Sequence, residues 1–223
     1  MSRTQVAPIA ATCSCRGVFD AAALPPDKTR AEAVERAWAQ LCAPGPTLDA
    51  PTRVRVIELA RAAWRGAGPT EPSALAAAVH AVASDAEGIT LEFVEDLERR
   101  GLPRLQYLEV LGVVGRLSNV DWYLRGLGAA LPQPVPLGLA GVTTGRVAPG
   151  SRLTDSWVPM VGDASAPHVL DALVDEGAAL RDLHEPAYID IARIGEGTHG
   201  DVLARPQIEF IAARTSYLNE CFY

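Results

Sequence analysis

The feature that most constrains the fold of this chain is a segment from about Pro103 to Leu117 that is apolar on every side after its first turn. Its central part, residues 107–114, reads Tyr-Leu-Glu-Val-Leu-Gly-Val-Val. A helix that is apolar all round belongs at the centre of a bundle rather than on its surface. Residues 110–114 alone would also suit a buried strand, but the helix caps around them and the lack of alternating neighbours favour a helix.

The residues before this segment read as four successive helices, each preceded by a residue that is favoured at an N-cap. These helices are expected to follow Thr29, Asp49, Thr70 and Thr90. Thr29 and Glu32 also have the spacing of a capping box. After the central segment, Ser118 and Asn119 predict a break and a new short helix from Asp121 to Leu127.

Composition divides the chain into four stretches. The expected division is a loose arm at residues 1–27, a first helical unit at 28–131, a connection at 132–163 and a second helical unit at 164–223. Proline and glycine are dense in the connection, which we expect to pack in part through Trp157, Val158 and Met160. No convincing strand partners are found, so the sequence predicts an all-α, multi-helix bundle.

Charge and cysteine content exclude several classes of function. The net charge is −7, which leaves no basic excess for nucleic-acid phosphates. No apolar run approaches the roughly 20 residues that span a bilayer, and the N-terminus lacks a convincing signal peptide. The four cysteines, at positions 13, 15, 42 and 221, match no zinc spacing. We therefore expect a cytoplasmic protein with reduced thiols, no metal and no contact with membrane or nucleic acid.

The last segment of the chain resembles a segment one hundred residues earlier (209 − 109 = 100). We call this sequence similarity the echo. The identical positions at that offset are Glu109 and Glu209, Asn119 and Asn219, and Tyr123 and Tyr223. Asp121 stands where the later copy has Cys221. Because neighbouring positions also match in size and polarity class, we interpret the two segments as copies in a degenerate tandem repeat.

Glu209 and Cys221 are the strongest candidates for catalytic residues. Asn219 is a good N-cap, which would place Cys221 in the first turn of a helix, where free N–H groups and the dipole lower a thiol pKa. A buried Glu209 on the preceding helix could then accept the thiol proton. The alternative is that Glu209 pairs with Arg205 or Arg214, and that Cys221 is a small, inert apolar residue.

Residues 203–209, 212–214, 216 and 219–223 together resemble the carboxymuconolactone decarboxylase and alkylhydroperoxidase D (AhpD)-like superfamily. Its redox members carry a glutamate twelve positions before the first cysteine of a Cys-x-x-Cys pair, which a histidine follows. Glu209 and Cys221 fit that spacing (221 − 209 = 12), and Tyr223 fits a slot where aromatic residues are common. The earlier copy, with Asp121 in place of the thiol, would then be a catalytically silent repeat.

The resemblance implies thiol-dependent reduction of a small hydroperoxide by two AhpD-like repeats, with a thiol or disulfide reductant and no cofactor. Cys221, Glu209 and Tyr223 would form the catalytic site. The second cysteine would stand one residue past Tyr223, and neither it nor the histidine is in this sequence. We therefore expect a weak or inactive peroxidase, as a fragment of a longer chain or a truncated homologue. Cys13 or Cys15 could replace the missing thiol from the arm.

Two other functions stay open on the sequence. A lyase resembling carboxymuconolactone decarboxylase would need no thiol. A helical oligomerisation module, whose repeats pack copy against copy, would use the apolar surface of the last helix. Members of the superfamily commonly form trimers or larger rings, so the resemblance also implies a homo-oligomer.

Overall fold

The computed structural model of the 223-residue chain describes residues 19, 22–69, 71–163, 168–187 and 203–218. Within these residues the only β-structure is two isolated bridges, Val147–Leu173 and Arg152–Met160, so the all-α class is confirmed. The chain forms two compact units, Met1–Leu183 and His184–Tyr223. The stretch at 132–163, which the sequence suggested as a connection between two units, belongs to the first of them.

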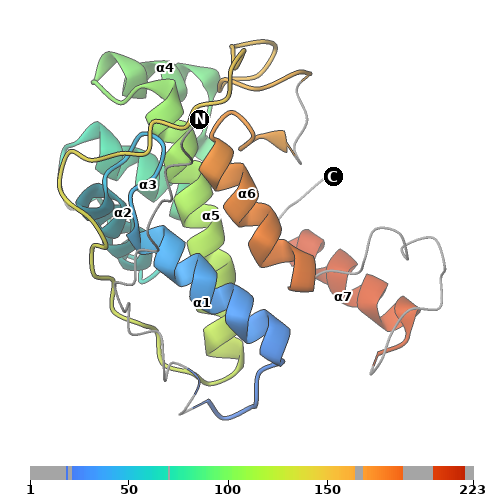
Figure 1. Cartoon of the computed structure of the whole chain (residues 1–223). Helices are drawn as coiled ribbons and strands as arrows, with labels where there is room; N and C mark the ends of the chain where they lie inside the picture. Colours follow the sequence, from blue (N-terminus) through green and yellow to red (C-terminus); the bar gives the residue numbers. More distant parts are fainter. Residues whose placement is uncertain (1–18, 20–21, 70, 164–167, 188–202, 219–223) are drawn as a thin grey trace, which may run out of the picture. The chain divides into compact units, whose positions relative to one another are not determined.

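The helices are named in chain order, as labelled in Figure 1. They are α1 (Lys28–Cys42), α2 (Ala50–Ala63), α3 (Ala74–Ser84), η1 (Ala86–Gly88), α4 (Leu91–Arg99), α5 (Arg104–Gly126), α6 (Val174–His184), η3 (Glu185–Ala187) and α7 (Arg205–Leu218). Helix α7 belongs to the second unit. No helix in the described ranges is both long and apolar enough to cross a lipid bilayer.

The N-caps of the early helices match the sequence prediction in part. The expected caps are found for α2 and α4, at Asp49 and Thr90. Helix α1 is capped by Asp27, whose Oδ1 accepts the backbone N–H of Arg30 at 3.0 Å, so the predicted cap Thr29 lies inside the helix. Helix α3 is capped by Ser73, whereas the predicted cap Thr70 lies outside the described residues. In both helices the cap is the residue directly before the first turn. Its backbone is extended, and its side chain accepts a hydrogen bond from a backbone N–H of that turn.

Helix α5 runs for 23 residues without a break, about 34 Å, so the predicted break at Ser118 and Asn119 is wrong. Asn119 caps nothing, and its Nδ2 donates to the carbonyl oxygen of Gly115 one turn earlier, at 2.9 Å. Beyond it, Val120 and Leu124 are fully buried. The buried face continues past the two polar residues. An unbroken helix is therefore more stable than two helices with a cap between them.

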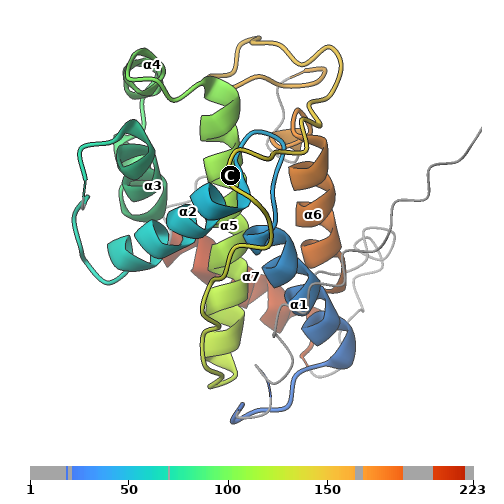
Figure 2. The same ribbon diagram turned by 60° about the vertical axis from the view of Figure 1, so that its left-hand side comes forward.

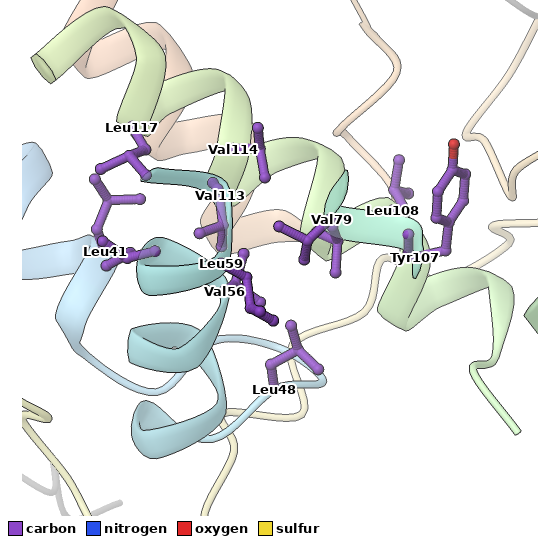
Figure 3. Packing of buried hydrophobic residues seen from close by; sticks show 14 of the residues in the cluster. Leu41, Leu48, Val56, Leu59, Val79, Tyr107, Leu108, Val113, Val114 and Leu117 are labelled. Atoms are coloured by element: carbon purple, nitrogen blue, oxygen red, sulfur yellow. The ribbon is translucent and has the colours of Figure 1, made fainter. Parts of the chain in front are cut away.

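Helix α5 is the centre of the first unit, as its all-round apolar sequence predicts. It contacts α1, α2 and α3, and both views of the ribbon show it among them (Figures 1 and 2). Figure 3 shows Val113 and Leu117 of α5 packed with apolar side chains of α1 and α2, among them Leu41 and Leu59. A fully buried leucine contributes about 2–3 kcal/mol to folding, so this layer carries much of the stability of the unit.

The stretch at 132–163 packs on the bundle in the way the sequence suggested. Val158 and Met160 are buried, while Trp157 keeps 44% of its surface exposed. Paired hydrogen bonds between the backbones of Arg152 and Met160 close this segment into a loop, at 3.0 and 2.9 Å. Arg104, at the start of α5, donates from Nη1 to the carbonyl oxygen of Trp157 at 2.9 Å. The loop is thereby fixed to the end of the central helix.

Candidate functional site

Glu209 lies on the exposed helix α7 of the second unit, not on a buried helix. Its side chain is 55% exposed, and its Oε1 accepts a hydrogen bond from Arg205 Nε at 2.5 Å. None of the described residues of α7 is buried. The expectation that Glu209 is buried is therefore wrong, and the expected alternative pairing with Arg205 is observed. Arg214 instead lies over the ring of Tyr217, with its Cζ 5.2 Å from the ring centroid.

Large apolar side chains of α7 are exposed as well. Phe210, Ile211, Tyr217 and Leu218 keep between 52% and 73% of their surfaces exposed. A lone helix of 14 residues is marginal in water, because helix formation of that length gains little without tertiary packing. The other helix that lies wholly within the described residues of this unit is the three-residue helix η3.

The other two predicted site residues, Cys221 and Tyr223, lie outside the described residues, as do Asn219 and the arm cysteines. The one cysteine within the described ranges is Cys42, at the end of α1, which is fully buried in the core of the first unit. A thiol without solvent access cannot meet a peroxide, so Cys42 is not a substitute nucleophile.

Glu109, the counterpart of Glu209 in the echo, lies in a very different environment. It is fully buried on α5, and its carboxylate is bonded from two sides. Oε2 accepts the backbone N–H of Thr47 at 2.6 Å, the hydroxyl of Thr47 at 2.7 Å and the backbone N–H of Leu48 at 3.0 Å. Oε1 accepts from Arg53 Nη1 at 2.5 Å. With its acceptor positions filled, this carboxylate holds the α1–α2 loop in place and is not free to move a proton.

Arg53 links Glu109 to a second buried carboxylate. Its Nη1 also donates to Glu176 Oε1 of α6 at 2.8 Å, and Arg116 of α5 donates to Glu176 Oε2 at 2.6 Å. The remaining donors of Arg53 bond the carbonyl oxygens of Leu41 and Gln40 at 3.3 and 3.2 Å. These carbonyls belong to the last turn of α1, where helix carbonyls need partners outside the helix; that of Gln40 also accepts the backbone N–H of the C-cap Ala43 at 3.3 Å. We call Arg53, Glu109, Arg116 and Glu176 the buried ion cluster.

Opposite charges favour the ionised forms of Arg53 and Glu176 despite burial, whereas burial together with the nearby Arg53 charge lowers the pKa of Arg116. Burial disfavours the charged guanidinium of Arg53, but the carboxylates of Glu176 and Glu109 outweigh it and raise the Arg53 pKa. Burial likewise disfavours the Glu176 carboxylate, but Arg116 and Arg53 outweigh it and lower the Glu176 pKa. Within the described ranges, two of the nitrogens of Arg116, Nε and Nη1, have no hydrogen-bond partner. Such buried orphan donors are costly, so the cluster is held by its surroundings rather than by ideal pairing.

Asp121, which stands at the position of Cys221 in the echo, forms a second buried ion pair. Arg61 Nε and Nη2 of α2 donate to its two carboxylate oxygens, both at 2.8 Å. Arg61 Nη1 also bonds the carbonyl oxygen of Pro132 at 2.8 Å, and its Cζ lies 5.1 Å from the ring centroid of Trp38. This bidentate ion pair connects α2, α5 and the start of the 132–163 stretch.

The chemistry open to these groups is limited. Every carboxylate oxygen of Glu109, Glu176 and Asp121 accepts at least one hydrogen bond from a neighbouring group. Within the described part of the chain, no three histidine, cysteine, aspartate or glutamate side chains come together to hold a metal ion. The buried ion cluster and the Arg61–Asp121 pair therefore organise the fold of the first unit.

Arg53, Arg116 and Glu176 were not predicted as a cluster from the sequence. A signal was present, because Glu109 and Arg116 both lie on a helix that is otherwise apolar all round. Charged side chains in such a helix must find partners of opposite sign, since an unpaired buried charge is prohibitively costly. The sequence did not indicate which residues those partners would be.

Acid is expected to destabilise the first unit through Glu176. Because its pKa is lower in the folded chain than its ordinary value of 4.5, it contributes stability that is complete above that value and is lost as the pH falls through the folded pKa. We expect the urea midpoint to fall as the pH drops below about 4.5, and to fall less steeply in Glu176→Gln. Asp182→Asn, which alters an exposed pair with Arg36, should keep the wild-type slope. An unchanged slope in Glu176→Gln would contradict this assignment.

Comparison of the chain with protein-family models, with curated protein sequences and with solved structures finds no match in any of the three. The resemblance to the AhpD-like superfamily therefore depends on the residues of this sequence alone.

Proposed function

We propose that this chain carries part of a thiol-peroxidase motif, with Cys221 as the peroxide-reacting thiol and Glu209 as its proton acceptor. The observation that supports the proposal most is the contrast between the two glutamates of the echo. Glu109 is enclosed by Thr47, Leu48 and Arg53, whereas Glu209 is 55% exposed, twelve positions before a cysteine. Of the two, only the Glu209 carboxylate is open to exchange a proton with a neighbouring group.

The Arg205–Glu209 pair suits this role. The Glu209 carboxylate has one arginine partner and is largely exposed, so acceptor positions on its oxygens remain open to a neighbouring donor. Arg205 comes from the first turn of the same helix, so it holds the glutamate without enclosing it. Tyr223, two residues after Cys221, would supply an aromatic wall for the substrate.

The proposed reaction is a single oxygen transfer. The Cys221 thiol gives its proton to Glu209, and the thiolate attacks the terminal oxygen of a hydroperoxide. The sulfur–oxygen bond forms as the oxygen–oxygen bond breaks, so the sulfur loses two electrons and the peroxide becomes an alkoxide. The alkoxide takes the proton from Glu209 and leaves as the alcohol. The resulting sulfenic acid returns to the thiol by reaction with a thiol reductant.

We expect one equivalent of cumene hydroperoxide to oxidise Cys221 to sulfenic acid, because the thiolate attacks the terminal oxygen of the peroxide. The product is measured by trapping with dimedone and mapping the adduct by mass spectrometry. Glu209→Gln should slow adduct formation by about a hundredfold, the lower end of what a general base contributes. Cys221→Ser should abolish the adduct.

The controls separate this proposal from its alternatives. Cys42→Ser and the double variant Cys13→Ser/Cys15→Ser should leave the rate at Cys221 unchanged. Trapping at another cysteine, or a rate indifferent to Glu209→Gln, would overturn the proposal. Lyase activity that survives thiol alkylation would favour the decarboxylase-like alternative. An unreactive Cys221 together with a mass that rises with concentration in ultracentrifugation would favour the oligomerisation module.

A further inference from the structure

The first unit has a hollow of about 410 Å³ beside the start of α5, which is open to solvent on one side. Its lining is largely apolar and comes from η1, α5 and the loop at 155–158. The residues that form its walls are Ala86, Ile89, Tyr107, Leu111, Trp157 and Val158. Sites for small molecules usually have volumes of about 300–1,000 Å³, with apolar walls and a few polar groups. The hollow is therefore large enough for a ligand of one or two rings.

Tyr107 is a largely buried residue of this lining whose hydroxyl keeps access to solvent. The residue is only 3% exposed, and its ring packs in the core of the first unit. Figure 3 shows the ring beside Leu108, with the hydroxyl oxygen directed away from the other labelled side chains. Among the described residues, no hydrogen bond is formed by this hydroxyl, although Tyr107 lines the hollow. Burial also raises the Tyr107 pKa, so the phenol stays protonated and keeps its donor.

The opposite wall is held by bonds that do not depend on a ligand. The carbonyl oxygen of Trp157 accepts from Arg104, whose side chain also pairs with Glu98 at 2.9 Å. The hydroxyl of Ser156 donates to the carbonyl oxygen of Val158 at 2.6 Å, which fixes the turn on either side of Trp157. Trp157 thus presents a half-exposed indole on a loop fixed to the bundle.

We propose that this hollow binds a small neutral aromatic molecule that carries one hydroxyl group, of the phenol class. Trp157 offers a flat aromatic surface, and aromatic pairs gain about 0.5–1.5 kcal/mol beyond the area they bury. The Tyr107 hydroxyl donates to the ligand oxygen, and the exposed Asp155 carboxylate at the rim accepts the ligand hydroxyl. Ile89, Leu111 and Val158 exclude a charged ring, because burial against them would remove its hydration.

The test is a titration of the full chain with 4-ethylphenol and with 4-ethyltoluene, which has nearly the same shape but no hydroxyl. Binding is followed in ¹H–¹⁵N spectra of the four tryptophan indoles, with the Trp157 signal assigned from Trp157→Phe. We expect a saturable shift of the Trp157 signal with 4-ethylphenol, while the signals of Trp38 and Trp122 stay in place. The affinity for 4-ethyltoluene should be lower.

Tyr107→Phe removes the hydroxyl and keeps the packed ring, so it should fold as the wild type does. We expect it to weaken 4-ethylphenol binding about fivefold, the effect of one neutral hydrogen bond, and to leave 4-ethyltoluene binding unchanged. Tyr123→Phe, on the same helix but outside the hollow, is the matched control and should bind as the wild type does. Leu111→Trp, which fills the hollow, should abolish the Trp157 shift.

Absence of a saturable Trp157 shift would overturn the proposal. So would an equal affinity of wild type and Tyr107→Phe for 4-ethylphenol, or an equal loss in Tyr123→Phe. Because the readout requires neither Cys221 nor a peroxide, these outcomes are independent of the proposed thiol chemistry.

Discussion

Arg53→Met is expected to lower the free energy of unfolding by about 3–5 kcal/mol, the cost of removing one partner from a buried ion pair. Methionine fills much of the same space but leaves Glu109 without its arginine, and leaves Glu176 with Arg116 alone. It also removes the donors to the carbonyl oxygens of Gln40 and Leu41 at the end of α1. Urea unfolding followed by circular dichroism measures the loss.

The matched control is Arg36→Met, because Arg36 also pairs with a carboxylate of α6 but on the surface. Arg36 and Asp182 are 50% and 36% exposed, and exposed pairs contribute at most about 1 kcal/mol. A loss for Arg53→Met no larger than that for Arg36→Met would mean that the buried ion cluster does not hold the bundle together.

Gly45→Ala is expected to cost about 3 kcal/mol, the upper end of the range for overpacking. A Cβ at this position would overlap the carboxylate of Glu109 and the guanidinium of Arg53. Neither group can move aside, because Glu109 is held by Thr47 and Leu48, and Arg53 is shared between two carboxylates. Glycine is therefore required in this loop for close approach and not for an unusual backbone angle. The urea midpoint measures the cost.

Gly68→Ala provides the comparison. Gly68 also lies in a loop after a helix, its backbone does not require glycine, and a Cβ there would meet nothing within 4 Å. We expect its unfolding free energy to stay within about 0.5 kcal/mol of the wild type, as for most surface substitutions. Similar losses for the two alanine variants would show that the overlap at Gly45 is relieved without breaking the buried ion cluster.

Local pattern was enough to predict the helices but not their exact limits. The apolar run at 107–114 identified the central helix, since no other position in a bundle buries all sides. Its continuation through Ser118 and Asn119 was not predictable from those two residues, because polar residues that favour caps also occur inside helices when tertiary packing continues. The choice of Asp27 over Thr29 as the first cap was similarly a competition between two good candidates two residues apart.

The buried ion cluster could not be read from the sequence because its members are distant along the chain. Arg53 is 56 positions from Glu109 and 123 from Glu176. Only the folded arrangement of α2, α5 and α6 brings them together. The echo between Glu109 and Glu209 shows that similar local sequence does not determine burial. Similar sequence surrounds a fully buried glutamate in one copy and an exposed one in the other.

The position of Glu176 has a consequence for how the chain is made. Residues 28–126 contribute every other member of the buried ion cluster, but Glu176 is synthesised some fifty residues after the end of α5 (176 − 126 = 50). Until then Arg116 has no carboxylate partner, and the α1–α5 bundle cannot close around it at low cost. Nascent domains fold as units when their last necessary segment leaves the ribosome. For the first unit that segment is α6, so we expect the buried ion cluster to be completed only after the whole Pro/Gly-rich stretch has been synthesised.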